Sequence, residues 1–167
     1  MTRVLGVDPG LGGTGYAVVE AGPGRLGVVE AGVVETRPDW ALDERVLAIY
    51  TAILARLDAH APSALALEDL YAAHAFPRTA LLMAHARGVI CLAARQRGVA
   101  VLALAPAEVK RAVAAHGAAS KHQVQHAVQR RLALPEPPRS THVADALALA
   151  LTGLARLGGD RRARGGR

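Results

Sequence analysis

Residues 4–36 read VLGVDPGLGGTGYAVVEAGPGRLGVVEAGVVET, and this stretch decides the fold. It begins with a short apolar run, Val4–Val7, which is typical of a buried strand and ends at Asp8. Two β-branched runs then flank Gly22-Pro23-Gly24-Arg25, whose residues favour a tight hairpin turn. With Gly32–Thr36 supplying a third strand, the stretch predicts three antiparallel strands.

The rest of the chain alternates helical and strand patterns. Three antiparallel strands followed by this alternation predict an α/β fold, a mixed sheet with helices on its faces. A length of 167 residues suits one domain over residues 1–158, and we expect residues 159–167 to be a basic, disordered tail. Later strands are expected over Ala64–Leu67 and Val99–Leu104, and helices over Leu42–Ala59, Pro77 to about Arg97, Pro106 to about His116, Lys121–Leu134, and Ser140 or Thr141 to near Gly158.

The glycine-rich segment after the first strand has a second interpretation. Gly10-Leu-Gly12-Gly-Thr-Gly15 matches G-x-G-x-x-G, the dinucleotide-binding fingerprint. That fingerprint needs a helix directly after it, because the pyrophosphate rests on the helix N-terminus. Here the following residues are β-branched and alternating, so a glycine-rich turn between strands is favoured over a dinucleotide site.

Charge is distributed unevenly along the chain, whose net charge is +6. Residues 1–69 hold five arginines and ten carboxylates, whereas residues 70–167 hold 15 basic and four acidic side chains. The second part therefore predicts a polyanionic partner. The single cysteine, Cys91, excludes a disulfide framework and predicts a cytoplasmic protein. The sequence contains no uncharged run of 18 apolar residues, so no membrane-spanning segment is expected.

Four polar residues stand where burial alone would not place them. Asp8 and Glu68 each end a predicted strand, and His142 and Asp145 lie three residues apart in an otherwise apolar helix. If that helix packs over the strand ends, three carboxylates and an imidazole converge. Like charges so close repel unless a cation is bound, and a pair of Mg²⁺ or Mn²⁺ ions about 3.5–4 Å apart suits phosphodiester hydrolysis.

Each of these residues also has a structural interpretation. Asp8 is a residue type that is common in turns, and Glu68 could be a solvated carboxylate at the end of a strand. His142 could be a residue at the start of a helix whose side chain is hydrogen-bonded to the backbone. Asp145 suits a salt bridge, although its apolar surroundings make it costly without a partner. When each residue is considered alone, the structural interpretation is favoured for Asp8, Glu68 and His142, but not for Asp145.

A series of short motifs, in order from residue 4 to about residue 152, resembles the RuvC family of Holliday-junction resolvases, within the retroviral-integrase and ribonuclease H superfamily. D-x-G alone is a weak signal, because actin-like kinases share it, whereas the ordered set is specific. The motifs are Leu5-Gly-Val-Asp8-Pro-Gly10 with Thr14-Gly15-Tyr16, Leu67-Glu68-Asp-Leu-Tyr71, Ala86-Arg-Gly88-Val89, Val109-Lys110, Ser120-Lys121 with Gln123-Val-Gln125, and Ala144-Asp145-Ala-Leu-Ala148.

The resemblance implies a ribonuclease H-like five-stranded mixed sheet, a homodimer, and metal-dependent symmetric nicking of four-way DNA junctions in recombination and repair. It also implies the RuvA–RuvB branch-migration complex as a partner. Asp8, Glu68 and Asp145 match the family's acidic metal ligands, with two ions per site. His142 stands where many members carry Asp and is counted with them as a catalytic residue and metal ligand, because neutral imidazole also binds metal ions. Because imidazole suits softer ions, we expect Mn²⁺ to support activity better than Mg²⁺.

The resemblance also implies DNA contacts. Tyr71 matches an aromatic position that contacts unpaired bases, and Lys110 and Lys121, the only two lysines, match positions that contact the phosphate backbone. Arg78, at the start of the next helix, is counted with them. The alternatives are a sheet-edge core residue for Tyr71 and solvated helix faces for the lysines. No role is predicted for His74, His85, His116, His122 and His126.

Two points stay open at this stage. Arg87 and the apolar face of the helix over 77–97 predict either a dimer contact or ordinary core packing. There are two rival functions. One is a YqgF-like RNA-processing nuclease of the same superfamily, and the other is a junction-binding protein that has lost catalysis because His142 replaces a carboxylate.

Overall fold

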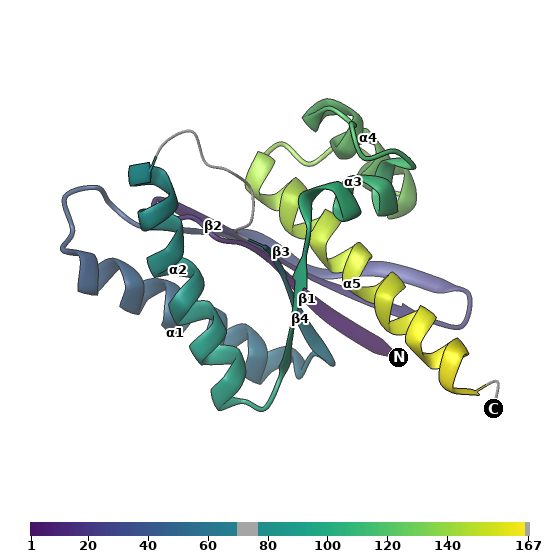
Figure 1. Cartoon of the computed structure of the whole chain (residues 1–167), viewed down its shortest axis with the longest axis horizontal. Coiled ribbons are helices and arrows are strands. Elements are labelled where there is room, and N and C mark those ends of the chain that lie inside the picture. Colours follow the sequence, from purple (N-terminus) through teal and green to yellow (C-terminus); the bar gives the residue numbers. More distant parts are fainter. Residues whose placement is uncertain (70–76, 166–167) are drawn as a thin grey trace.

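The computed structural model describes residues 1–69 and 77–165, with Pro77 and residues 159–165 described by their backbone only. Within these residues, five strands form one mixed sheet in the spatial order β3-β2-β1-β4-β5, with helices on both faces (Figure 1). The first three strands pair antiparallel, β4 adds in parallel beside β1, and β5 adds in parallel beside β4, as the sequence predicts. The elements are β1 (Thr2–Asp8), β2 (Gly13–Gly22), β3 (Arg25–Glu35), α1 (Leu42–His60), β4 (Ala64–Glu68), α2 (Pro77–Gln96), β5 (Ala100–Leu104), α3 (Pro106–Ala114), α4 (Lys121–Arg131) and α5 (Thr141–Gly165).

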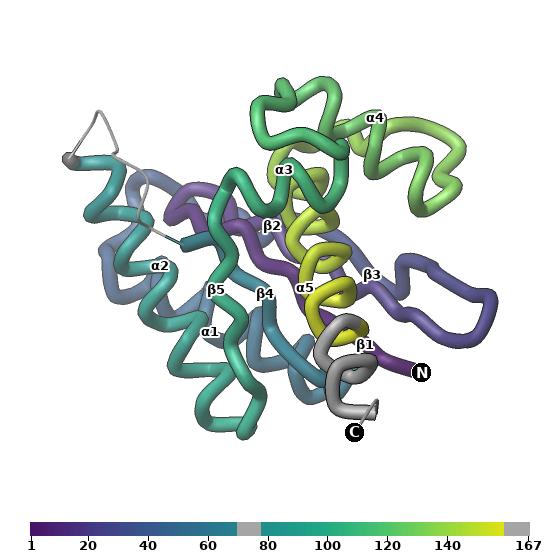
Figure 2. The backbone as a smooth tube through the Cα atoms, turned by 45° about the vertical axis from the view of Figure 1, so that its right-hand side comes forward, coloured from purple at the N-terminus to yellow at the C-terminus, as the bar shows by residue number. Residues whose placement is uncertain are grey.

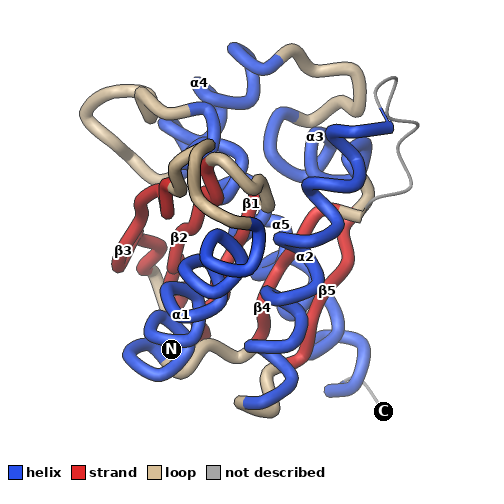
Figure 3. Tube along the Cα trace, turned by 90° about the vertical axis from the view of Figure 1, so that its left-hand side faces the viewer, coloured by secondary structure: helices blue, strands red, loops and turns tan. Residues whose placement is uncertain are grey.

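The two faces of the sheet carry separate hydrophobic cores. Successive side chains of a strand point to opposite faces, so Leu5 and Val7 pack beneath α1 and α2 (Figure 3). Val4 instead packs with residues of α3, α4 and α5. The sheet therefore separates an α1–α2 layer from a layer built on α5, and a side chain can reach a shared edge of the sheet from either layer.

Helix α5 lies directly on β1 and β2 (Figure 2) because two glycines leave room for its backbone. A β-carbon at Gly6 would lie 2.1 Å from the carbonyl oxygen of Ala146, and one at Gly15 would lie 2.2 Å from that of His142. No side chain fits at such distances. The approach brings the first turns of α5 to the end of β1, where Asp8 lies.

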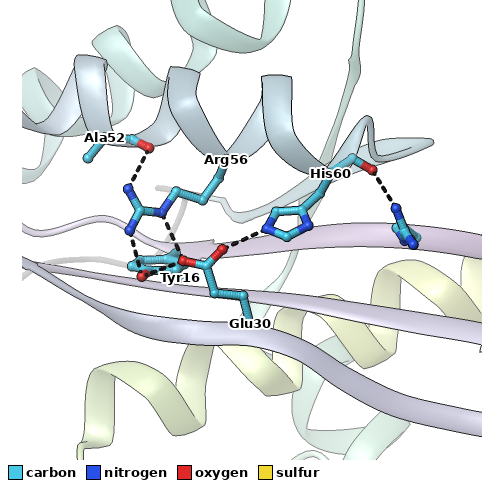
Figure 4. Close-up of polar contacts among 6 residues, drawn as sticks. Tyr16, Glu30, Ala52, Arg56 and His60 are labelled. Atoms are coloured by element: carbon cyan, nitrogen blue, oxygen red, sulfur yellow. Dashed lines mark hydrogen bonds and ion pairs between the residues drawn. The ribbon is translucent and has the colours of Figure 1, made fainter.

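Helix α1 is tied to the outer strands by a group that we call the Glu30 cluster: Tyr16, Glu30, Arg56 and His60 (Figure 4). The Glu30 carboxylate accepts hydrogen bonds from the Tyr16 hydroxyl at 2.9 Å and from Arg56 Nε at 3.2 Å, and His60 Nε2 lies 2.6 Å away. The Arg56 guanidinium also lies over the Tyr16 ring, 4.5 Å from its centroid. These contacts connect α1 to β2 and β3.

Several helix ends differ from the predicted ones. Ser120 caps α4 as expected, and its hydroxyl accepts from the backbone of the third residue of that helix. Helix α4 ends at Arg131, before the predicted Leu134. Helices α1 and α3 end close to their predicted ends, at His60 and Ala114, and are followed by Ala61 and Ala115, which adopt left-handed backbone angles (φ 42° and 67°) without being glycine. Their backbone N–H groups complete the last turns, which offsets part of that cost. Gly158 does not end α5, which continues to Gly165 through the first residues of the expected tail.

Two further expectations are settled by the described elements. Strand β2 begins at Gly13, so a strand and not a helix follows the glycine-rich segment, and the dinucleotide-binding interpretation fails. Among the helices of residues 1–69 and 77–165, none combines the length and apolarity needed to cross a bilayer.

Candidate active site

The core of the candidate site lies at the carboxyl ends of β1 and β4. These parallel strands are in register with Val7 opposite Leu67, so Asp8 and Glu68 are the next residues on adjacent strands. Both runs before them are fully buried, which fixes the backbone at the strand ends. The two carboxylates are therefore neighbours because of strand register, as their positions in the sequence predict.

Helix α5 brings the other two predicted residues to the same place. His142 and Asp145 line a cleft of about 620 Å³ together with Asp8 and Glu68. His142 Nδ1 lies 2.8 Å from Asp8 Oδ2, with 47% of the histidine side chain and 14% of the aspartate side chain exposed. The predicted convergence of three carboxylates and one imidazole is thus present in the structure.

The electrostatics of the cleft oppose ionisation of its carboxylates. Burial raises the pKa of Glu68 above its usual range, and the nearby charges of Asp8 and Asp145 raise it further. Burial and the Asp8 charge likewise raise the pKa of Asp145. Burial also raises the pKa of Asp8, although the hydrogen bond with His142 acts in the opposite direction. Ionising all three carboxyl groups would therefore concentrate poorly solvated negative charge in the cleft.

Divalent cations suit this donor set by its chemistry. Carboxylate oxygens are hard ligands of the kind that Mg²⁺ and Mn²⁺ take, and a cation would relieve the mutual repulsion. Within residues 1–69 and 77–165, however, no three His, Cys, Asp or Glu side chains are grouped closely enough to coordinate one ion. One or two of these carboxylates are enough to hold such an ion when water and substrate phosphate oxygens supply its other ligands.

The predicted DNA-contacting residues fall into three groups. Lys110 of α3 and Lys121 of α4 line the cleft, and their charges act to lower the pKa values of the nearby carboxyl groups. Arg78 is exposed at the start of α2 and is not among the residues lining the cleft, although its neighbour Thr79 is. Tyr71 lies outside the described residues.

Arg87 holds the end of β4 in a way that the sequence does not reveal. Its Nη1 donates to the backbone carbonyl of Glu68 at 2.5 Å, and its Nη2 lies 4.0 Å from Asp69. Only 18% of its side chain is exposed, and its hydrogen bond is made within the chain. Because the main partner is a backbone carbonyl, no residue pattern signals the contact.

The loop after Asp8 is fixed by two threonines. Thr14 Oγ1 donates to the carbonyl oxygen of Gly10 at 2.8 Å, and Thr36 Oγ1 donates to that of Leu11 at 2.5 Å. Arg45 of α1 donates from Nε to Thr36 Oγ1 at 2.9 Å and also lines the cleft. The sequence gives no signal for Arg45, which is one of many arginines until the fold brings it here.

Known proteins share this architecture and sequence. The family model described as "Crossover junction endodeoxyribonuclease RuvC" matches residues 4–153. The crossover junction endodeoxyribonuclease RuvC of Rhodopirellula baltica is 45% identical over 150 residues, which span 90% of this chain and 84% of that protein. The chain belongs to the RuvC family. The family assignment confirms the resemblance seen in the sequence and favours RuvC over the YqgF-like alternative.

Solved structures agree with the RuvC assignment. T. thermophilus RuvC in complex with Holliday junction substrate superposes with a TM-score of 0.88 at 37% identity, over 95% of this chain and 97% of that one. The yeast mitochondrial Holliday junction resolvase Ydc2, at 12% identity and a TM-score of 0.64 over 96% and 84% of the two chains, shares the fold. The predicted ribonuclease H-like sheet is confirmed. RuvC-family membership also implies a nuclease that depends on divalent metal ions.

Proposed function

We propose that this RuvC-family chain is a crossover junction endodeoxyribonuclease that resolves four-way (Holliday) DNA junctions by paired nicks in recombination and repair. The observation that carries the proposal is one cleft that combines the buried carboxylates of Asp8, Glu68 and Asp145 with the cations of Lys110 and Lys121. Negative charge that is costly without a cation supports metal binding, and positive charge beside it supports phosphate binding.

Each residue has a distinct role in this proposal. Asp8, Glu68 and Asp145, with His142 as a fourth ligand, would hold two divalent metal ions. Such ions, when bound, activate an attacking water and stabilise the leaving oxygen of a phosphodiester. Lys110 and Lys121 bind phosphates next to the scissile bond. Arg87, through the Glu68 carbonyl, keeps the end of β4 in place.

His142 distinguishes this site chemically from one built of carboxylates alone. An imidazole in place of a carboxylate leaves the site one negative charge poorer, and nitrogen is a softer donor than oxygen. The contact between His142 Nδ1 and Asp8 Oδ2 at 2.8 Å puts the ring within reach of the same ions. We therefore expect Mn²⁺ to support faster nicking than Mg²⁺.

The DNA surface extends beyond the cleft in this proposal. Arg78 is exposed next to the cleft-lining Thr79, which supports a phosphate contact at the rim. Tyr71, in the segment between β4 and α2, stacks on an unpaired base at the junction centre, an interaction worth about 1–3 kcal/mol. The lone Cys91, which excludes a disulfide framework, supports a cytoplasmic location.

The proposed function is tested with a synthetic four-way junction incubated with Mg²⁺ or Mn²⁺. We expect symmetric nicks in opposing strands, faster with Mn²⁺, and none with Asp8→Asn. Asp58→Asn is the matched control, because Asp58 pairs with Arg97 on the surface away from the cleft. Binding without nicks would establish the non-catalytic alternative, cleavage of single-stranded RNA would establish the YqgF-like one, and equal rates with both ions would contradict the role of His142.

Paired nicking requires two sites, and the exposed face of α2 supports a homodimer. Leu81 and Leu92 are 64% and 51% exposed there, which is costly for large apolar side chains in water. A second copy of the chain would cover them. We expect Leu81→Glu to sediment as a monomer at concentrations where the wild type is a dimer. Leu47→Glu, at a position 61% exposed on α1, is the control and should leave the dimer intact.

A further inference from the structure

The cleft has a third cation, on the wall opposite the two lysines. Arg45 comes from α1, in the layer on the other face of the sheet from α3 and α4, which carry Lys110 and Lys121 (Figure 3). All three side chains line the cleft that also contains Asp8 and Glu68. The carboxylates are thus flanked by positive charge from both layers of the fold.

The Arg45 guanidinium is held in place on one edge. Its Nε donates to Thr36 Oγ1 at 2.9 Å, and Thr36 is itself only 7% exposed. The Thr36 hydroxyl donates onward to the carbonyl of Leu11, and its backbone N–H donates to that of Gly12 at 3.1 Å. The side chain is therefore anchored to the loop that follows Asp8, which limits the conformational entropy lost on binding a ligand.

The outer nitrogens of Arg45 have no carboxylate to bind within the part of the chain that the structure describes. Its neighbour Glu44 is already used, because Glu44 Oε2 accepts from the backbone N–H of Ala41 at 2.9 Å. Arg45 also stands near the N-terminus of α1, where the helix dipole disfavours a cation. A half-buried guanidinium that lies against the helix dipole without a counter-ion does not stabilise the fold. Binding of an anionic ligand explains its position.

We propose that Arg45 binds a phosphodiester of the DNA substrate, on the side of the carboxylates opposite Lys110 and Lys121. The inference rests on the proposed function, because it takes DNA as the substrate of this cleft. The guanidinium is a planar fork that matches two phosphate oxygens, whereas each lysine offers a point charge. Contacts from both layers hold the backbone across the cleft, with the scissile phosphate above Asp8 and Glu68.

The test measures binding to a four-way junction over a series of salt concentrations, without divalent ions so that no strand is cut. Arg45→Gln should weaken binding by about tenfold, the factor of one charge-assisted hydrogen bond, and reduce the salt slope of log K by about 0.9. Arg37→Gln is the matched control. It removes the same charge nearby, but Arg37 is already paired with Asp39, so its slope should equal that of the wild type.

A second measurement does not depend on how a variant folds. In the wild-type chain, a dicarbonyl reagent that modifies arginines should react with Arg45 in the free protein, and bound junction should protect it while leaving Arg37 reactive. Arg45 equally reactive with and without junction, or a wild-type salt slope in folded Arg45→Gln, would overturn the inference. A wild type that neither binds nor nicks the junction would instead overturn the proposed function.

Discussion

The Glu30 cluster and the cleft treat their carboxylates in opposite ways. Glu30 is surrounded by donors, and hydrogen bonding to His60, foremost, lowers the pKa of its carboxyl below the usual range. Glu68 and Asp145 gain no such side-chain donor among the described residues, and burial with like charge nearby raises their pKa values. The same chemical group is thus stabilised on one face of the sheet and destabilised at its edge.

The difference separates a structural use of carboxylates from a functional one. A carboxylate with its partners built in contributes to folding, and it has little left to offer a ligand. A carboxylate that is buried without partners lowers the stability of the fold. Its oxygens stay available to bind a ligand from outside the chain. This comparison predicts that substitutions in the two regions separate activity from stability.

The largest expected effect comes from neutralising one cleft carboxylate. Asp145→Asn keeps the shape of the side chain but removes an oxygen of the proposed metal site and the charge that repels Glu68. We expect nicking to fall by more than about 100-fold, since even residues that only support a metal ligand cost 10–100-fold. We expect the thermal midpoint without divalent ions to stay level or rise. A variant that loses activity only because it unfolds would contradict the comparison.

Glu30→Gln should give the reverse pattern. It removes the charge that binds Arg56 and His60 in a cluster whose Glu30 side chain is 35% exposed. We expect a loss of about 1 kcal/mol in the free energy of unfolding, with nicking unchanged. Urea denaturation measures the loss. Glu136→Gln, in an exposed pair with Arg139, is the control and should change neither property.

The smallest effect is a difference in pH dependence. Because the pKa of Glu30 is lowered by folding, its stabilisation is present above its unfolded pKa and is lost as the pH falls through its folded pKa. The raised pKa of Asp145 has the opposite sign: its ionised form destabilises the fold at neutral pH, and acid removes that cost. Wild type should therefore be more stable than Glu30→Gln and less stable than Asp145→Asn near pH 7 without divalent ions. Both differences in stability from wild type should shrink toward acid pH. If the two variants differed from wild type in the same direction, the opposite roles of Glu30 and Asp145 would be refuted.

The predictable part of the site follows from short-range patterns. Asp8 and Glu68 end apolar runs, and the three-residue spacing of His142 and Asp145 places them on one helix face, so their convergence needs only the expected sheet. The contacts of Arg45 and Arg87 could not be found in this way, because their partners are the Thr36 hydroxyl and the backbone carbonyl of Glu68, which leave no pattern in the sequence. The left-handed residues that follow α1 and α3, Ala61 and Ala115, were not predicted, because only glycine gives a sequence signal for that conformation.

The contact of α5 with Gly6 and Gly15 also determines when, during synthesis, the proposed site can form. Asp8 leaves the ribosome early, whereas Asp145 is synthesised more than a hundred residues later, on the helix that must settle onto the finished β1–β2 pair. A nascent chain therefore carries only part of the acidic site. The proposed nicking site is therefore complete only after α5 has been made and has packed onto β1 and β2.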